Sequence, residues 1–202
     1  MAYFPVFMDI AGQDVLIVGG GTVALRKLEK LLLYGPQITL VAPSVDPMIM
    51  AHPEVYIFER EFEEEMLEKK KLVIAATDDR ALNTRIAALC REKGFPVNAV
   101  DQREDCTFLF PALVKRGELS IGISTGGASP TASRWVKEQI DNLLPSEFDQ
   151  ILSYLDELRP QIKAMVADEK TRARVYAKLL QLCMVGEMPL SKEQIEELIK
   201  GM

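Results

Sequence analysis

The stretch DVLIVGGGTVALRKLEKLLL, residues 14–33, decides the fold of this 202-residue chain. The run that ends at Val18 is apolar and rich in β-branched side chains, which predicts a buried strand. Three glycines follow at once, and the apolar residues beyond them recur at helical spacing. A strand, a glycine turn and a helix in that order predict a site that binds a dinucleotide.

The spacing of the glycine motif is Gly19-x-Gly21-x-x-Ala24. In such a motif the first glycine permits a tight turn, the second lets the backbone approach a pyrophosphate, and the third small residue keeps the helix close to the strand. The amino end of the helix offers unpaired N–H groups and the positive end of its dipole to phosphates, so Thr22 and Val23 join the two glycines as candidate cofactor-binding residues. A plain strand-to-helix turn, with glycines for geometry alone, is the alternative.

Composition excludes several classes of function. The formal net charge of −6 argues against a nucleic-acid partner, because such binding needs a basic surface. No apolar run approaches the ~20 residues that span a bilayer, so we expect no membrane partner. The first ten residues lack the basic region of a signal peptide, and we expect a cytoplasmic protein.

The residues that usually bind metals or act as nucleophiles are sparse. The three cysteines, Cys90, Cys106 and Cys183, are far apart and match no zinc spacing or disulfide framework, so we expect reduced thiols. The only histidine, His52, stands in a proline-flanked loop. We therefore predict no resident metal, and any acid–base chemistry falls to a carboxylate.

The first half of the chain alternates strands and helices. The pattern predicts helices after the glycine turn, at residues 62–70, and from a cap at Asp79 to about residue 93. The predicted strands are residues 3–8, 14–18, 37–42, 55–58, 72–76 and 96–100. This alternation is typical of an α/β fold with a parallel, doubly wound sheet that extends to about residue 110.

Beyond residue 110 the pattern changes. Residues 112–115 and 118–124 flank Arg116-Gly117, which suggests two antiparallel strands, and Ser129-Pro130 opens a helix. From residue 145 onward only helices are predicted, the last with a capping box at Ser191 and Gln194. We expect an NAD-binding Rossmann-like domain at 1–111, a small β-plus-helix segment at 112–144 and a helical C-terminal domain at 145–202.

Ligands of open α/β sheets lie beyond the carboxyl ends of the strands. The polar residues predicted to project there are Ser44, Thr77, Asp78, Asn98 and Asp101. The end of the second parallel strand lacks both the carboxylate that usually binds the adenosine ribose and an arginine for a 2′-phosphate. This leaves the choice of dinucleotide open, although we favour NAD, with Ser44 on a ribose hydroxyl.

Asp101 is the most interesting carboxylate. It follows an apolar strand, a place where burial can fit a carboxyl group to accept or give a proton. The alternative is a turn or cap aspartate. We expect Gly21 and Asp101 to border one shared groove.

A second candidate site is the loop Ser124-Thr125-Gly126-Gly127 and the helix after it. Small residues, free N–H groups and a helix start resemble an anion-binding nest, although a plain turn and helix cap fits equally well. Residues 112–140 contain four basic residues, Arg134 among them, against two acidic ones. In a chain of net negative charge this is a local basic region that suits an acidic substrate.

With these residues in view, the chain resembles the precorrin-2 dehydrogenase and sirohydrochlorin ferrochelatase family, of the siroheme-synthase N-terminal type. The resemblance covers essentially the whole length. It rests on YFPVF, VLIVGGGTVALRK, AATDD, VNAVD, FLFPALVKRGELSIGISTGGASP and the helical tail. The glycine motif alone is not specific, whereas its combination with ISTGGASP is.

The resemblance implies NAD-dependent oxidation of precorrin-2 to sirohydrochlorin, in a homodimer that the middle segment holds together. It matches Asp101 to an aspartate that acts in catalysis, and Ser124 and Thr125 to hydroxyl residues near the tetrapyrrole. Thr125 stands where some members have serine. Some members also insert ferrous iron, and cobaltous ion is a related substrate; the sequence does not separate members with this activity from those without it.

Two other functions compete with this interpretation. An NAD-sensing regulatory module without catalysis explains residues 1–110 but gives no role to ISTGGASP or to the basic segment. A generic NAD-linked dehydrogenase of a small alcohol or acid often uses a histidine or a Tyr-Lys pair, and neither stands in a suitable place.

Overall fold

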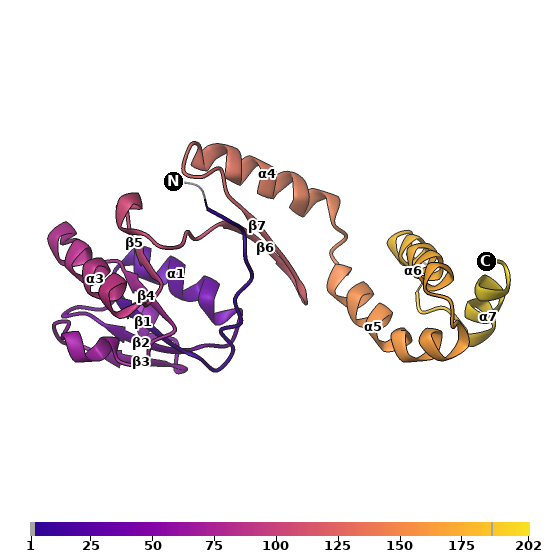
Figure 1. Cartoon of the computed structure of the whole chain (residues 1–202), viewed down its shortest axis with the longest axis horizontal. Coiled ribbons are helices and arrows are strands. Elements are labelled where there is room, and N and C mark those ends of the chain that lie inside the picture. The colour runs from indigo at the N-terminus through magenta and orange to yellow at the C-terminus, as the bar shows by residue number, and fades with distance from the viewer. Residues whose placement is uncertain (1–2, 187) are drawn as a thin grey trace. The chain divides into compact units, whose positions relative to one another are not determined.

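The computed structural model describes residues 3–186 and 188–202. The chain forms two compact units, with the break between Phe110 and Pro111 (Figure 1). The finer division into 1–111, 112–144 and 145–202 stays a prediction. None of the described helices combines the length and the apolar character that crossing a membrane requires.

The first unit holds a five-stranded parallel sheet in the order β3-β2-β1-β4-β5. Its strands are β1 (Asp14–Val18), β2 (Gln37–Val41), β3 (Val55–Phe58), β4 (Leu72–Ala75) and β5 (Val97–Ala99). β1 pairs with β2 on one side and with β4 on the other, so the order of the strands reverses at β1. This confirms the predicted parallel sheet, and ligands of such sheets bind beside the reversal.

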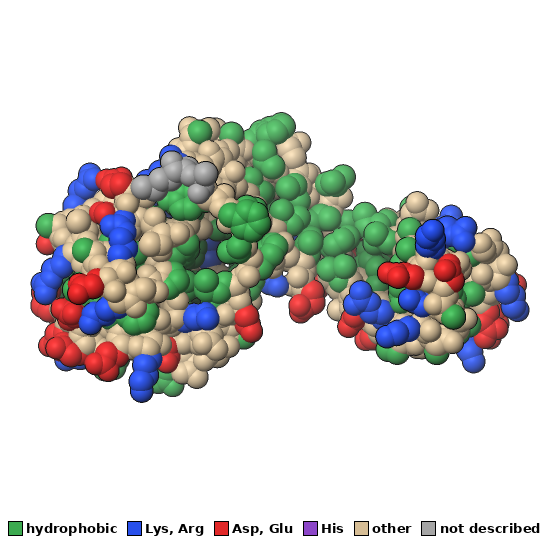
Figure 2. Space-filling model, in the orientation of Figure 1, with side chains coloured by type: hydrophobic (Ala, Val, Ile, Leu, Met, Phe, Trp, Pro, Cys, Tyr) green, Lys and Arg blue, Asp and Glu red, His purple; other side chains and the backbone are tan. Residues whose placement is uncertain are grey.

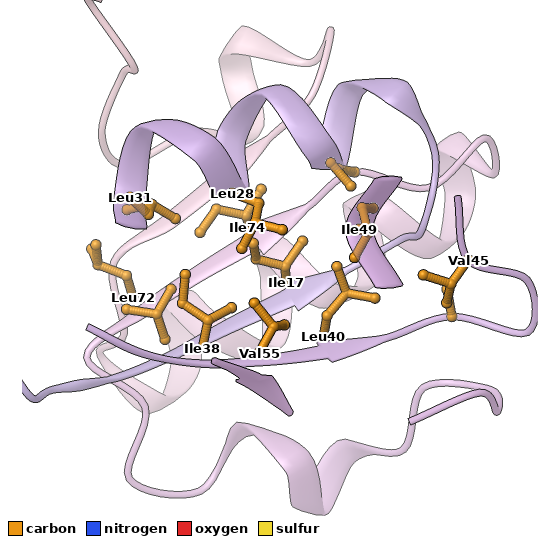
Figure 3. Packing of buried hydrophobic residues seen from close by; sticks show 14 of the residues in the cluster. Ile17, Leu28, Leu31, Ile38, Leu40, Val45, Ile49, Val55, Leu72 and Ile74 are labelled. Atoms are coloured by element: carbon orange, nitrogen blue, oxygen red, sulfur yellow. The ribbon is translucent and has the colours of Figure 1, made fainter. Parts of the chain in front are cut away.

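Helices cover both faces of the sheet, as a doubly wound fold requires (Figure 1). The helical elements of this unit are α1 (Thr22–Leu32), α2 (Pro47–Met50), η1 (Glu64–Leu67), α3 (Arg80–Lys93) and η2 (Arg103–Asp105). α1 and α2 pack on one face, and Figure 3 shows Leu28 and Leu31 of α1 among the strand residues Ile17, Ile38 and Ile74. Because both faces are covered, the central strands are apolar along nearly their whole length.

The predicted strand at residues 3–8 is wrong. These residues have no regular secondary structure, and the aromatic rings of Phe4 and Phe7 are exposed. A strand needs a hydrogen-bonding neighbour as well as suitable side chains, and Pro5 removes one donor. Tyr3 is held instead through its hydroxyl group, which donates to the carbonyl oxygen of Cys106 over 3.4 Å.

The predicted helix at residues 62–70 is also wrong, because only the single 3₁₀ turn η1 forms there. A helix this short depends on an apolar face that packs against the protein. Here Leu67 alone is buried, and Phe62 and Met66 pack only partly against the same core, so the apolar face is small. Lys69 then adopts a left-handed conformation with φ of 60°, which redirects the chain into β4.

The second unit begins with a hairpin and continues with four helices. Its elements are β6 (Ala112–Arg116), β7 (Leu119–Ile123), α4 (Pro130–Leu143), α5 (Phe148–Met165), α6 (Glu169–Met184) and α7 (Lys192–Lys200). The predicted antiparallel pairing is confirmed. Ser129 caps α4, and the capping box of Ser191 and Gln194 opens α7, both as predicted.

The last three helices of this unit share a small core of their own. It consists of Leu158 and Ile162 from α5, Val175 and Leu179 from α6, and Ile195 from α7. All five side chains are buried. The spacing of three or four residues within α5 and α6 is that of one helix face, which is why the predicted helices pack here.

Candidate functional site

A cleft of about 590 Å³, here called the glycine cleft, opens at the carboxyl ends of β1, β2 and β4. The predicted cofactor-binding residues that line it are Gly19, Gly21, Thr22, Ser44, Thr77 and Asp78. The strand order reverses at β1, so the cleft stands where α/β sheets bind nucleotides. Two other predicted cofactor-binding residues, Val23 and Asn98, are not among its lining residues.

Two of the three glycines are required by the chain itself. Gly19 has φ of +121°, and a Cβ there would lie 2.2 Å from the carbonyl oxygen of Ala76. A Cβ on Gly20 would lie 2.3 Å from the carbonyl oxygen of Ser44. Residues 19 and 20 therefore need glycine so that the ends of β1, β2 and β4 can approach one another.

Gly21 is glycine for a different reason. Its φ of −91° suits any residue, and a Cβ there would meet no atom of the described residues within 4 Å. Neither conformation nor packing within the chain excludes a side chain at this position. The missing side chain instead leaves the backbone open toward the cleft, which is what the close approach of a pyrophosphate needs. The residues present therefore fit a dinucleotide.

The amino end of α1 supplies the positive potential of the cleft. Gly21 is the N-cap and has no side chain with which to bond the first N–H groups. The residues of the first turn are all uncharged, so the dipole of the helix is not neutralised there. Since no lysine or arginine is among the described residues that line the cleft, backbone N–H groups are the donors available to a phosphate.

A buried amide fixes the loop between β4 and α3. The Thr77 hydroxyl group donates to Oδ1 of Asn83 over 2.8 Å, and Nδ2 of Asn83 donates back to the Thr77 carbonyl oxygen over 2.9 Å. Asp79 caps α3 as predicted, accepting from the backbone N–H of Ala81 and of Leu82. Sequence reasoning missed Asn83, although an amide on the apolar face of a helix was a usable signal.

The end of β2 presents polar groups at the far side of the cleft. Ser44 is exposed there, whereas Asp46 caps α2 by accepting from the Met48 N–H over 2.9 Å. Glu61, which follows β3, also lines the cleft. The prediction missed Glu61 because its neighbours were assigned to a helix. Its position beyond the strand next to β2 was the signal that could have found it.

Asn98 has a structural position within the same unit. Its side chain is buried, and Nδ2 donates to the carbonyl oxygen of Phe108 over 3.0 Å and to Sγ of Cys106 over 3.4 Å. The amide thus holds the loop that follows β5 against the strand. A direct contact between Asn98 and a cofactor stays a prediction.

A second hollow of about 530 Å³, here called the lysine hollow, lies between α1 and the end of β5. Its lining residues are Val23, Arg26, Lys27, Glu29, Lys30, Val100 and Asp101. Thr22 lines the glycine cleft and Val23 the lysine hollow, so the first turn of α1 borders both. Gly21 and Asp101, expected to border one groove, line different hollows.

Asp101 stands in a tight turn directly after β5. Its φ of 58° lies in the left-handed region, which aspartate tolerates better than most residues. The side chain is exposed, so burial within the chain does not provide the setting that we expected for a base. The chemical role of Asp101 stays a prediction. The structure shows in addition that charged residues of α1 line the same hollow as Asp101.

Lys27 is the residue of this region that sequence reasoning missed. Its Nζ lies 4.1 Å from the centroid of the Phe110 ring. Burial lowers the pKa of Lys27 to about 8, and nearby Lys30 lowers it further, whereas Asp101 opposes the shift. The available signal was the position of Lys27 one helical turn after Val23, on the flank that faces the end of β5.

The hydroxyl loop of the second unit is held by its own hydrogen bonds. The Thr125 Oγ1 accepts from the Ser129 N–H over 3.1 Å and lies 3.2 Å from Oγ of Ser133. Ser124 Oγ accepts from the Gly126 N–H over 3.1 Å. Gly126 and Gly127 both have positive φ, as the turn requires. These contacts fit a turn and helix cap, and binding of an anion or of substrate by this loop stays a prediction.

Two of the four basic residues at 112–140, Arg116 and Lys137, form ion pairs within the second unit. Nη2 of Arg116 donates to Oδ1 of Asp141 over 3.0 Å, and Lys137 pairs with the other carboxylate oxygen of Asp141. The hydrogen bond from Lys137 is the main reason why the pKa of Asp141 is lowered. Asp141 stands just beyond the segment in which the basic excess was counted. Arg134 is exposed, and its binding role stays a prediction.

Thiol chemistry has little support in this chain. All three cysteines are free and buried. Burial raises the pKa of Cys90 to about 11, and it also raises the pKa of Cys106 and of Cys183. Such thiols are poor nucleophiles because the thiolate is the reactive form.

Two family models match the chain. The description "Putative NAD(P)-binding" covers residues 6–112, and "Sirohaem biosynthesis protein central" covers residues 116–143. The first match spans more than half of the chain and contains both hollows. The second covers β7, the hydroxyl loop and α4.

Curated relatives carry the name siroheme synthase. The protein of Thioalkalivibrio sulfidiphilus is 34% identical over 208 residues, which cover 99% of this chain and 42% of the relative. That of Methylococcus capsulatus is 35% identical, over 90% of this chain and 39% of the relative. The chain thus spans about two fifths of these relatives.

Among solved structures, "SirC, precorrin-2 dehydrogenase" matches with a TM-score of 0.74 and 26% sequence identity. The match covers 99% of this chain and 100% of that one, so the two folds correspond from end to end. The chain therefore belongs to the family described as putative NAD(P)-binding, and it is similar over nearly its whole length to siroheme synthases and to a precorrin-2 dehydrogenase.

Proposed function

We propose that this chain oxidises precorrin-2 to sirohydrochlorin with NAD as the hydride acceptor, a step of siroheme biosynthesis. The observation that carries the proposal is the open backbone of Gly21, in a chain that matches a precorrin-2 dehydrogenase over its whole length. The reaction removes a hydride and a proton from the macrocycle. NAD supplies the acceptor for the hydride, and a protein base accepts the proton.

The charges of the glycine cleft favour NAD over NADP. Asp46, Glu61 and Asp78 line the cleft, whereas no described lining residue is basic. A 2′-phosphate adds negative charge that these carboxylates repel and that no arginine compensates. The same carboxylates suit ribose hydroxyl groups, which donate hydrogen bonds. The residues directly after β2 did not distinguish NAD from NADP, whereas the carboxylates that line the cleft favour NAD.

The proposal gives the predicted residues distinct tasks. The N–H groups of Thr22 and Val23 hold the pyrophosphate at the amino end of α1, and Ser44 serves the adenosine ribose. Thr77, fixed by Asn83, stands beyond β4, on the opposite side of β1 from Ser44. Asp101 accepts the proton. Residues 124–127 and Arg134 contact the macrocycle.

The test is anaerobic incubation of the chain with precorrin-2 and NAD, followed by visible and near-ultraviolet absorbance. We expect equal molar amounts of sirohydrochlorin and NADH. Binding of NAD without oxidation would instead identify the chain as a nucleotide-sensing module and contradict the proposal. Heat-denatured protein serves as the control for spontaneous oxidation of the macrocycle.

We further propose that the segment 112–144 forms a homodimer. The β6–β7 hairpin pairs with no other described strand, and Val114 is its one buried residue. A two-stranded hairpin is marginally stable by itself; α4 packs against it, yet the hairpin's other residues stay only partly buried or exposed, which supports a further covering partner. Trp135 and Leu143 of α4 are 60% and 76% exposed, and Figure 2 shows hydrophobic side chains gathered over α4 and α5. Sedimentation equilibrium, with Trp135→Lys expected to give monomer, tests this proposal.

Chelation is tested in the same reaction mixture. After sirohydrochlorin has formed, ferrous or cobaltous ion is added as a substrate and the visible spectrum is followed. Faster metal insertion than in the protein-free control assigns chelatase activity to the chain, and equal rates contradict it.

A cytoplasmic location is part of the proposal, because precorrin-2 oxidation needs the cellular NAD pool and the three thiols are free.

A further inference from the structure

The lysine hollow differs in charge from the rest of the first unit. Two successive turns of α1 contribute Arg26, Lys27 and Lys30 to it, against the carboxylates of Glu29 and Asp101. The whole chain has a net charge of −6, so a hollow with a cationic excess is a local exception. Such an exception attracts an anionic group from solution.

Lys27 is held in this hollow at a cost in stability. Its ammonium group lies over the Phe110 ring, and no described carboxylate lies within ion-pair distance of it. A partly buried cation without a carboxylate partner is unfavourable, and the ring compensates only in part. The lowered pKa of about 8 reflects the same cost. An anionic ligand would supply the missing partner.

Two cations of the second unit are placed differently from Lys27. Arg116 and Lys137 each have an ion-pair partner within the unit, because both contact the carboxylate of Asp141. Lys27 has no such partner among the described residues. Lys27 thus differs from Arg116 and Lys137 in being a partly buried cation without an ion-pair partner among the described residues.

The geometry points to Lys27, with Arg26 beside it, as a subsite that binds a carboxylate side chain of the tetrapyrrole next to Asp101. This inference rests on the proposed function, because precorrin-2 carries acetate and propionate groups around its ring. A carboxylate on Lys27 fixes the edge of the macrocycle in the hollow that Asp101 also lines. Lys27 is thus a binding residue that orients the substrate for the base.

The experiment compares Lys27→Met with Lys27→Arg and with Lys71→Met. Methionine keeps an unbranched apolar chain over Phe110 but removes the charge, and arginine retains it. Lys71 is exposed and precedes β4, at the amino ends of the strands, so its replacement controls for general charge. The probe is sirohydrochlorin, titrated by visible absorbance, with NAD affinity measured separately by fluorescence.

We expect Lys27→Met to weaken sirohydrochlorin binding about tenfold or more, as loss of a charge-assisted contact does. The KM for precorrin-2 should rise in parallel, while NAD affinity stays within twofold. Lys27→Arg should remain within about threefold of the parent protein, and Lys71→Met should be unchanged. Unchanged binding in Lys27→Met, or an equal loss in Lys71→Met, overturns the inference.

Failure of this inference is distinguishable from failure of the proposed function. If the unmodified chain does not oxidise precorrin-2, the proposed function is wrong. If it does, and Lys27→Met keeps the parent KM and sirohydrochlorin affinity, only the subsite is wrong. If Lys27→Met does not fold, Lys27→Gln and the pH dependence of the unmodified protein replace it.

Discussion

The glycine cleft and the lysine hollow border the same turn of α1 but use opposite chemistry. The cleft is lined by three carboxylates and no described basic residue, whereas the hollow is lined by three basic residues and two acidic ones. Both are proposed to take anionic ligands. The cleft does so with backbone N–H groups and a helix dipole, and the hollow does so with side-chain charge.

This difference separates two kinds of specificity. Backbone N–H groups at a helix terminus bind the pyrophosphate without a side-chain cation. Such a cation would also bind the 2′-phosphate of NADP. Flexible side-chain cations suit carboxylates at the edge of a large ring, because their reach tolerates variation in ligand position. Helix α1 can therefore contribute to two binding sites that select different anionic ligands.

The largest effect is expected from Gly19→Ala. The φ of +121° and the 2.2 Å approach of the Ala76 oxygen leave no room for a Cβ, so β1 and β4 must separate. We expect a loss of about 3 kcal/mol or more in the free energy of unfolding, together with loss of NAD binding. Urea unfolding followed by circular dichroism measures the first effect.

Gly21→Ala is the matched control, since the added methyl group is the same. We expect the free energy of unfolding to stay within about 1 kcal/mol of the parent value, because no described atom opposes a Cβ there. NAD affinity should nevertheless fall at least tenfold. A variant that binds NAD normally would show that the cofactor does not approach Gly21.

Asp101→Asn tests the base in the lysine hollow. We expect kcat for precorrin-2 oxidation to fall about 10²- to 10⁴-fold, the usual contribution of a positioned base. Asparagine tolerates the left-handed conformation of residue 101, so the fold should be retained. NAD affinity should not change, because Asp101 does not line the glycine cleft. A parent-like kcat would remove Asp101 from the mechanism.

The pH dependence of binding sharpens the assignment of Lys27. With a pKa of about 8, Lys27 is charged at pH 7 and mostly neutral at pH 9, so sirohydrochlorin affinity should fall about tenfold across this range. The main cause of the shift is burial; the ionisable groups around Lys27 are Lys30, Cys106, Asp101 and Arg26. Lys27→Arg should abolish this pH dependence, and a flat profile in the unmodified protein would contradict the assignment.

The same shift has a consequence for stability. The unfolded state binds a proton on Lys27 up to a pKa near 10.5, whereas the folded state releases it near pH 8. Lys27 therefore costs stability below pH 8, and this cost disappears as the pH rises toward 10.5. Lys27→Met should unfold at a higher urea concentration than the parent at pH 7, with a smaller difference at pH 10.

The smallest effect concerns the choice of dinucleotide. Glu61→Gln removes one of the carboxylates of the glycine cleft, and we expect the preference for NAD over NADP to narrow by about threefold, because an exposed charge acts weakly. Glu65→Gln, an exposed residue of η1 that does not line the cleft, is the control. Equal KM ratios in the parent and Glu61→Gln would assign the discrimination to other residues.

Local pattern was enough to predict the central strands, the glycine turn, the caps at Asp79, Ser129 and Ser191, and the hairpin. Each of these features depends on residues that are adjacent in the sequence, so the local sequence is enough to predict it. The errors at residues 3–8 and 62–70 have the opposite origin. A strand needs a neighbouring strand to which it hydrogen-bonds, and a short helix needs a core against which it packs. Neither contact can be predicted from the residues of the segment alone.

The candidate site divides in the same way. Residues 19–22 and 77–78 could be predicted, because the motif and the carboxyl ends of parallel strands place them together. The exposure of Asp101, the position of Lys27 over Phe110 and the pairing of Arg116 with Asp141 join residues many positions apart. Only the folded chain brings such residues together, so the tertiary structure alone decides which charges are compensated and which can bind a ligand.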